Sequence, residues 1–216
     1  MNLKLRLLKK GAEAHLYLDD WFGMKVVKKI RVAKSYRVRP LDEHLRRFRT
    51  AHEAKLLSSA KRFGVPTPTV FDVDLGNFAI VMEFIEGVTL KKLLPEVSRS
   101  ERVRFCRLVG KCVGLLHSNG VFHGDLTTSN MIACNDKIYF IDFGLGGFSM
   151  EVEHFGVDLH LLLRVLESSH YEIANECFSA VVEGYRSAFD RADLVIRKVK
   201  EIRMRGRYVV ERRISK

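Results

Sequence analysis

Two short segments near the middle of this 216-residue chain constrain its fold more than any other feature. The first, residues 123–130, reads His-Gly-Asp-Leu-Thr-Thr-Ser-Asn. The second starts with the apolar run Ile138–Ile141, which predicts a buried strand, and ends in Asp142-Phe143-Gly144. Such a strand would deliver Asp142 to its end. The fold is therefore expected to place a strand end beside a polar loop that carries Asp125 and Asn130.

An Asp followed by an Asn five residues later, and then by Asp-Phe-Gly, is the pattern of kinase-type phosphotransferases. Phosphoryl transfer needs an oxygen acceptor near the attacking hydroxyl and hard oxygen ligands for magnesium on the ATP phosphates. Asp125 is the candidate catalytic acceptor, and Asn130 and Asp142 are the candidate metal ligands. Asp-Phe-Gly alone usually marks a turn, so the specificity lies in the joint order and spacing. His123 is expected to be a packed, hydrogen-bonded anchor of the loop.

Kinase-type sites also need a strand lysine that contacts the ATP phosphates and pairs with a helix glutamate. Val26–Ile30 is the only good strand candidate, and it carries both Lys28 and Lys29. Successive side chains of a strand point to opposite faces, so only one lysine can face the nucleotide. Glu53, in the middle of a predicted helix, is the candidate partner. The residues alone leave the choice between the two lysines open.

Two further residues are candidates for ATP binding. Gly11 lies in the first predicted turn, where a loop would cover the phosphates, but it is the only glycine there and the acidic Glu13 follows it. A single glycine gives a less close backbone approach to phosphate than a glycine-rich loop does. Glu83 begins the segment 83–87, where strand patterns stop and helical patterns start. This segment is the expected hinge of the nucleotide pocket.

Alternating patterns predict a small antiparallel sheet in the first part of the chain. Residues 3–31 are expected to form three strands, with turns at Lys10-Gly11 and at Asp19-Asp20 followed by Gly23. A helix is predicted over 41–63, and strands over 70–73 and 78–82 would complete a five-stranded sheet. Helical patterns follow at 103–117, 157–166 and 171–185.

These patterns predict an α+β fold with the two lobes of a protein kinase. The N-terminal lobe would span 1–84 and contain the small antiparallel sheet and its one long helix. A reduced, mostly helical C-terminal lobe would span 85–216, with the catalytic loop and a basic tail.

The absence of proline after Pro95 narrows the function. A conventional protein kinase has a long segment after Asp-Phe-Gly that ends in Ala-Pro-Glu and builds the peptide-docking platform. Only about a dozen residues separate Gly144 from the next predicted helix. The nucleotide machinery is therefore expected without the surface that would select a peptide.

Net charge is unevenly distributed along the chain. Residues 1–49 hold 14 basic and 5 acidic side chains, and residues 197–216 hold 9 basic and 2 acidic ones, around a mildly acidic middle. A polyanion such as RNA would suit both basic ends, although a solvated basic surface explains them equally well. Arg203, Arg205 and Arg207 could contact the phosphates of such an RNA or reach back to the catalytic cleft, and the alternative is a disordered basic end.

Composition also bears on location. No apolar run approaches the roughly 18 residues of a membrane span. The four cysteines are scattered and form no Cys-x-x-Cys pair, which is typical of reduced thiols. We therefore expect a cytoplasmic protein without a membrane segment.

The catalytic segments resemble those of the small atypical kinase of the KEOPS complex, the PRPK family. Generic kinases have Arg at position 124 and Lys at 127, where this chain has Gly124 and Thr127. Spacing from Lys34-Ser35-Tyr36-Arg37 back to the family's strand lysine selects Lys29. One departure is Arg39-Pro40, where the family usually has His-Pro. Other matching segments cover nearly the whole chain in order: Gly11–Ala14, Arg49-Thr50, Glu53-Ala54, Val65–Pro68, Val157–Leu159 and Arg203–Arg207.

This resemblance implies ATP and Mg²⁺ as cofactors, with ATPase activity and serine/threonine autophosphorylation. It also implies a role in forming threonylcarbamoyl-adenosine at position 37 of tRNA, with a threonylcarbamoyl-transferase subunit and a small accessory subunit as partners and tRNA nearby. Two alternatives stay open: a protein kinase that phosphorylates external Ser/Thr substrates, and a non-catalytic scaffold with a kinase fold.

Overall fold

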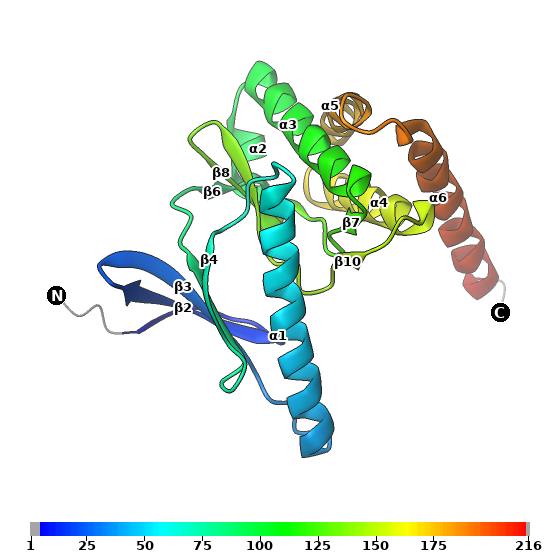
Figure 1. Ribbon diagram of the computed structural model, residues 1–216. Coiled ribbons are helices and arrows are strands. Elements are labelled where there is room, and N and C mark those ends of the chain that lie inside the picture. The colour runs from blue at the N-terminus through cyan, green and yellow to red at the C-terminus, as the bar shows by residue number, and fades with distance from the viewer. Residues whose placement is uncertain (1–4, 215–216) are drawn as a thin grey trace.

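The computed structural model describes the backbone of residues 5–214 and the side chains of residues 5–205. A five-stranded antiparallel sheet with one long helix forms one part of the molecule, and a set of helices forms the other (Figure 1). The predicted α+β, two-lobed architecture is therefore confirmed. The last strand of the sheet ends at Glu83, one residue before the predicted boundary between the lobes. The boundary itself stays a prediction.

The sheet has the order β1-β2-β3-β5-β4. Its strands are β1 (Arg6–Lys10), β2 (Ala14–Trp21), β3 (Met24–Arg31), β4 (Val70–Asp74) and β5 (Ala79–Glu83). β3 is the central strand and pairs with β2 and β5, so a side chain on it is held from both sides. This position gives Lys29 a rigid support.

The expected turn at Asp19-Asp20 is wrong. Both residues lie inside β2, and the chain turns instead at Phe22 and Gly23, whose φ angles are 51° and 83°. Two consecutive positive φ angles are what a two-residue hairpin needs to match the twist of its strands. The Asp20 carboxylate accepts a hydrogen bond from the Gly23 N–H at 3.0 Å, so it stabilises the turn from within the strand.

Helix α1 (Arg39–Arg62) packs along the sheet (Figure 1). It begins two residues before the predicted start, because Pro40 fits the first turn of a helix, where its missing N–H has no partner to lose. Gly64, with φ at 83°, lies just past its end, close to the predicted stop. The buried face of α1 carries Glu53 toward β3.

The second part of the chain starts with β6 (Val88–Thr89), α2 (Leu90–Glu96) and α3 (Arg99–Ser118). Ser98 and Glu101 form a capping box at the start of α3, and Gly120, with φ at 69°, follows its end. Short strands then frame the catalytic segments: β7 (Val121–Phe122), a 3₁₀ turn η1 (Thr128–Asn130), β8 (Met131–Cys134), β9 (Lys137–Phe140) and β10 (Gly147–Phe148).

Three helices complete the fold: α4 (Val152–Ser169), α5 (Ala174–Arg186) and α6 (Ala192–Ile214). α4 begins five residues before the predicted start, so only seven residues separate it from Gly144. α6 was not predicted. Its first half packs on α4, and its second half runs out past the other helices (Figure 1). No helix of the described residues 5–214 is long and apolar enough to cross a membrane.

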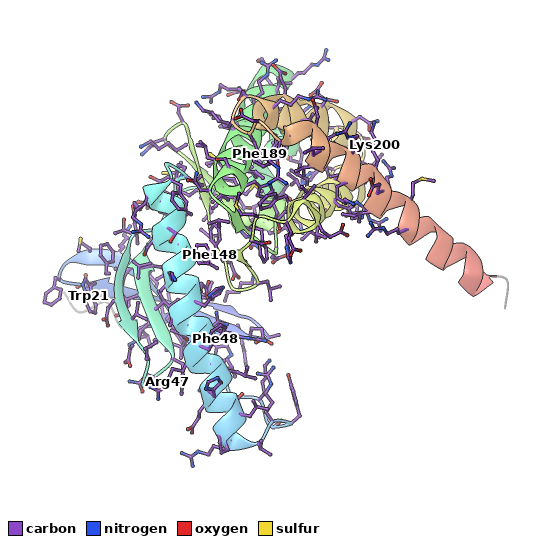
Figure 2. All side chains as sticks on the ribbon, turned by 45° about the vertical axis from the view of Figure 1, so that its right-hand side comes forward. Trp21, Arg47, Phe48, Phe148, Phe189 and Lys200 are labelled. Carbon is purple, nitrogen blue, oxygen red and sulfur yellow. The ribbon has the colours of Figure 1, made fainter. Side chains whose placement is uncertain are left out.

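Helices α3 and α5 approach through their glycines. A Cβ atom added to Gly110 would collide with the backbone of Val181, and one added to Gly184 would collide with the backbone of Arg107. The two backbones therefore touch with no side chain between them. Phe189, just past α5, lies among the C-terminal helices and packs against the ring of Tyr185 on α5 (Figure 2).

Candidate functional site

Lys29 lies at the centre of an ion-pair network that joins the two parts of the molecule. Its Nζ atom lies 2.6 Å from Glu53 Oε1 on α1 and 2.7 Å from Asp142 Oδ1, just after β9. Both Lys29 and Glu53 are buried, whereas the Asp142 side chain is half exposed. Of the two adjacent lysines, Lys29 is thus the one that meets Glu53.

The network fixes the charges of its members. Burial disfavours the charged form of Lys29, but the nearby carboxylates of Glu53 and Asp142 more than offset this and raise its pKa. Burial likewise disfavours ionised Asp142, but the Lys29 ammonium holds the pKa of Asp142 below its usual range. At neutral pH the site therefore presents a charged ammonium and a charged carboxylate on one cavity wall.

Arg31 also contacts Glu53 and was missed as a site residue from the sequence. Its guanidinium donates to Glu53 Oε2 at 2.5 Å and to the Arg49 carbonyl at 3.2 Å. Lys29 and Arg31 share one face of β3, and both are buried. The sequence did carry a signal for Arg31: it shares a strand face with Lys29, and a buried cation requires an anionic partner.

Asp125 and Asn130 are hydrogen-bonded to each other in the predicted catalytic loop, residues 123–130. The Asn130 amide nitrogen donates to Asp125 Oδ2 at 2.8 Å and to the Asp125 carbonyl at 3.0 Å. Because the amide nitrogen is engaged in this way, the Asn130 side-chain oxygen is left as an acceptor for a cation. The η1 turn places Asn130 directly before β8, which pairs with the strand that leads to Asp142.

Asp158 on α4 anchors the catalytic loop and was not predicted as a site residue. Its carboxylate is buried and accepts from the backbone N–H groups of His123 at 2.6 Å and Gly124 at 2.8 Å. It also lies 3.4 Å from His117 Nε2, and His117 Nδ1 lies 2.8 Å from the Tyr185 hydroxyl. His123 is fully buried, as expected of an anchor, and its Nε2 lies 3.1 Å from the Ile141 carbonyl.

Because His117 and His123 are buried, we predict that the folded protein loses stability in mild acid. Burial lowers the pKa of both His117 and His123, although neighbouring carboxylates partly oppose it. Below pH about 6.5 the unfolded chain therefore binds protons that the folded chain excludes, and the free energy of unfolding should fall by up to about 1.4 kcal/mol per histidine per pH unit. Urea unfolding at pH 7.5, 6.0 and 5.0 measures this slope.

A free energy of unfolding that stays constant between pH 7.5 and 5.0 would contradict neutral burial of the two histidines. Asp142 and Asp158 contribute little to the change in the free energy of unfolding between pH 7.5 and 5.0. Their pKa values lie below the usual 3.8 in the folded protein, so the stability they contribute is lost only at lower pH.

The backbone conformation at residue 124 requires a glycine. Its φ angle is 78°, and a Cβ atom there would collide with the Leu145 carbonyl. The loop can therefore lie against the segment after Gly144 only if residue 124 has no side chain. An Arg at this position, as in generic kinases, would need a different path for one of the two segments.

The Asp-Phe-Gly segment is held in one conformation. Phe143 is fully buried, with its ring centroid 4.4 Å from that of His123. Asp142 has a φ of 63°, in the left-handed region that few residues other than Gly, Asn and Asp adopt. Burial of Phe143 directs the neighbouring Asp142 side chain to the cavity.

Two adjoining cavities share Lys29 and Asp142. The first, of about 370 Å³, is the more polar one, because charged side chains such as Glu13 and Asp125 line it beside Gly11 and several apolar residues. The second, of about 280 Å³, is mostly apolar. Its lining includes Val27, Met82, Glu83, Ile85, Asn130, Ile132 and Ile141. A polar and an apolar compartment that meet at a lysine suit a ligand with a charged chain and an aromatic base.

Gly11 and Glu83 lie at opposite ends of this space. A Cβ atom on Gly11 would lie 2.8 Å from the Ala14 carbonyl, so the turn needs glycine there. The Glu83 side chain accepts hydrogen bonds from the Thr69 N–H at 3.0 Å and the Thr69 hydroxyl at 2.8 Å. Burial disfavours the Glu83 carboxylate, but these bonds lower its pKa overall. Its side chain is thus committed to Thr69 at the edge of the apolar cavity.

Asn130 and Asp142 fit a magnesium ion that a ligand helps to hold. Both line the 280 Å³ cavity and offer one amide and one carboxylate group, whose oxygens are hard ligands. Within the described part of the chain, no three His, Cys, Asp or Glu side chains converge well enough to hold a metal by themselves. Magnesium is usually bound by one or two protein groups together with substrate phosphates, which agrees with this sparse donor set.

The basic tail lies on α6, away from both cavities. Arg203 lies 2.8 Å from Glu167, and Arg205 lies 2.8 Å from Glu153, both on α4. Neither arginine lines a cavity of the site. The side chain of Arg207 lies outside the described residues.

Comparisons with known proteins agree with the geometry. A family model described as the RIO domain matches residues 24–155. The KEOPS complex subunit Bud32 of Pyrococcus abyssi is 47% identical over 94% of this chain and 96% of its own length. A probable bifunctional tRNA threonylcarbamoyladenosine biosynthesis protein of Methanothermobacter thermautotrophicus is 45% identical over 94% of this chain, which spans only 36% of that protein.

A solved structure supports the fold alone. WaaP, in complex with an acyl carrier protein, aligns over 88% of each chain with a TM-score of 0.54 at 15% sequence identity. The family itself is shown by the RIO-domain match, which covers more than half of the chain, and by the two relatives above 40% identity. The chain belongs to the kinase-like RIO-domain family and, within it, to the Bud32 group.

Proposed function

We propose that this chain binds ATP with magnesium and hydrolyses it as the kinase-like subunit of a KEOPS-type complex that forms threonylcarbamoyl-adenosine on tRNA. The observation that carries the ATP proposal is the position of Lys29, which is held by Glu53 and Asp142 where the polar and apolar cavities meet. The printed names of the relatives support the tRNA-modification role.

Each residue has a role in this proposal. Lys29, held by Glu53, binds the inner phosphates, and the apolar cavity beside Glu83 takes the adenine. Asn130 and Asp142 would hold Mg²⁺, which supplies charge neutralisation on the phosphates. Asp125 positions the attacking hydroxyl or water and accepts its proton. Gly11 lets the first turn approach the phosphates.

The short segment after Gly144 favours ATP hydrolysis over phosphorylation of external proteins. Only seven residues lie between Gly144 and α4, which leaves little chain to build a peptide platform. The partners in this proposal are a threonylcarbamoyl-transferase subunit and a small accessory subunit, with tRNA nearby. The longer bifunctional relatives support a close partnership, because in them a region like this chain is part of a larger protein.

Lys29→Gln is expected to weaken ATP–Mg²⁺ binding roughly tenfold to a hundredfold, because it removes a charged hydrogen-bond donor to phosphate. Titration calorimetry of the full chain measures the affinity. Lys28→Gln is the matched control, since this half-buried neighbour lies on the opposite face of β3. No ATP binding by the unmodified chain would refute the proposal and favour a non-catalytic scaffold.

Turnover distinguishes the remaining alternative. We expect free phosphate from ATP to appear faster than labelled phosphate on any added protein, and the rate to rise when the transferase subunit and tRNA are present. Faster transfer to a defined protein substrate than to water would instead favour an external protein kinase.

A further inference from the structure

The 370 Å³ cavity contains two arginines that the proposed function leaves without a role. Arg31 and Arg49 line it together with Lys29, Asp125 and Asp142. Arg31 comes from β3, and Arg49 lies on α1 one turn before Glu53. A hydrogen bond of 3.2 Å from the Arg31 guanidinium to the Arg49 carbonyl joins the two residues. The arginines therefore form one cationic wall of the polar cavity.

Arg31 has an unsatisfied donor. The residue is only 6% exposed, and its Nε atom is buried with no hydrogen-bond partner among the described residues. An unpaired buried donor typically costs about 1–3 kcal/mol, so such groups are rare unless a ligand or another function explains them. Arg31 also lines the cavity, so its guanidinium group lies within reach of an anionic ligand bound there.

Arg49 has an acidic partner that a ligand could replace. Its guanidinium lies 3.0 Å from Glu13 Oε2 in the first turn, and Glu13 Oε1 lies 3.4 Å from Lys34 Nζ. The Arg49 side chain is one-third exposed and that of Glu13 is half exposed, so the pair is only weakly held. Lys34 also donates to the Ala12 carbonyl at 2.5 Å and so keeps the turn in place without Arg49.

We propose that Arg31 and Arg49 form an anion subsite for the terminal phosphoryl group of a nucleoside triphosphate, and that this group displaces Glu13 from Arg49. Lys29, held farther in by Glu53 and Asp142, serves the inner phosphates. The identity of the ligand as a triphosphate rests on the proposed function, whereas the subsite rests on the arginines. Two guanidinium groups would replace the backbone N–H groups that a glycine-rich loop offers to phosphate.

The subsite is tested with ligands that differ in their phosphates. Titration calorimetry of the full chain with a non-hydrolysable ATP analogue, AMP and inorganic tripolyphosphate separates the terminal group from the adenine. Arg49→Gln is expected to weaken the analogue and tripolyphosphate roughly tenfold to a hundredfold and to leave AMP unchanged. Arg47→Gln is the matched control, because it removes the same charge from the exposed face of α1 (Figure 2).

Glu13→Gln supplies a result that misfolding cannot imitate. Removal of the competing carboxylate should raise the affinity for the analogue by a fewfold and leave AMP unchanged. Thermal unfolding of each variant checks that the fold is retained. Unchanged or weaker binding of the analogue by Glu13→Gln would overturn the displacement of Glu13.

The outcomes separate this inference from the proposed function. If the analogue binds the unmodified chain and Arg49→Gln equally well, the subsite is wrong and ATP binding stands. Equal losses in Arg47→Gln and Arg49→Gln would overturn it too, since general surface charge would then explain both. If tripolyphosphate binds through Arg49 but the analogue does not bind, the anion subsite stands and the ATP proposal fails. Binding of neither ligand overturns both.

Discussion

Asp142→Asn is expected to lower ATP turnover at least about a hundredfold, because the site loses the negative charge that would hold magnesium on the phosphates. Asn is the suitable replacement. Asp142 has a φ of 63°, and Asn adopts the left-handed region far more readily than Ala does, so the backbone can stay as it is. The initial rate of phosphate release at saturating ATP–Mg²⁺ measures the effect.

Asp136→Asn is a matched control for this prediction. Asp136 also has a left-handed backbone, with φ at 60°, but it lies in the exposed β8–β9 turn and pairs with Arg104. It lines neither cavity of the site, so its replacement should leave turnover unchanged. Near-normal turnover in Asp142→Asn would remove Asp142 from the reaction.

Asp158→Ala is expected to lower the free energy of unfolding by about 3–5 kcal/mol. The change removes the acceptor from the backbone N–H groups of buried His123 and half-buried Gly124, and it removes the partner of His117. Each unpaired buried group costs about 1–3 kcal/mol, and this change leaves three hydrogen-bonding groups without their partner. Urea unfolding at pH 7.5 measures the loss.

Asp193→Ala, at an exposed position, is the control for Asp158→Ala. Its side chain is 73% exposed and pairs with Arg186 on the surface, so Asp193→Ala should change stability little. Turnover adds a second measurement, because Asp158→Ala should also loosen the loop that carries Asp125. A stability loss no larger than that of Asp193→Ala would contradict this role. Solvent or neighbouring groups would then accept the hydrogen bonds of the His123 and Gly124 N–H groups without Asp158.

Much of the architecture could be predicted because strong local patterns coincide with burial. The alternation in the first part of the chain gave the five strands, and the apolar run before Asp142 gave β9, which ends one residue earlier than expected. Strand alternation left Lys28 and Lys29 as alternatives, and the family's spacing selected Lys29, the lysine that contacts Glu53 in the structure. These features depend on short stretches of sequence, whose periodicity is readable without knowing the rest of the fold.

Features that depend on distant partners were missed. α6 was not predicted because its basic residues mask a thin apolar stripe, of which Ala192, Val195 and Val199 are buried. The anchoring role of Asp158 depends on N–H groups more than thirty residues away in the chain. Arg31 is similar, since its hydrogen bonds to Glu53 and to the Arg49 carbonyl are made with residues of α1. Long-range hydrogen bonds of this kind leave no periodic signal.

The close contact between α3 and α5 restricts how these two helices can move relative to each other. Because Gly110 and Gly184 bring the two helix backbones together, a sliding or tilting motion would drive one main chain into the other. α3 leads directly through Gly120 and β7 to the loop with Asp125, so this loop follows a helix whose close packing resists displacement. Under the proposed function, closure around a nucleotide would therefore come mainly from the sheet and α1, which would bring Lys29 and Arg49 toward Asp125.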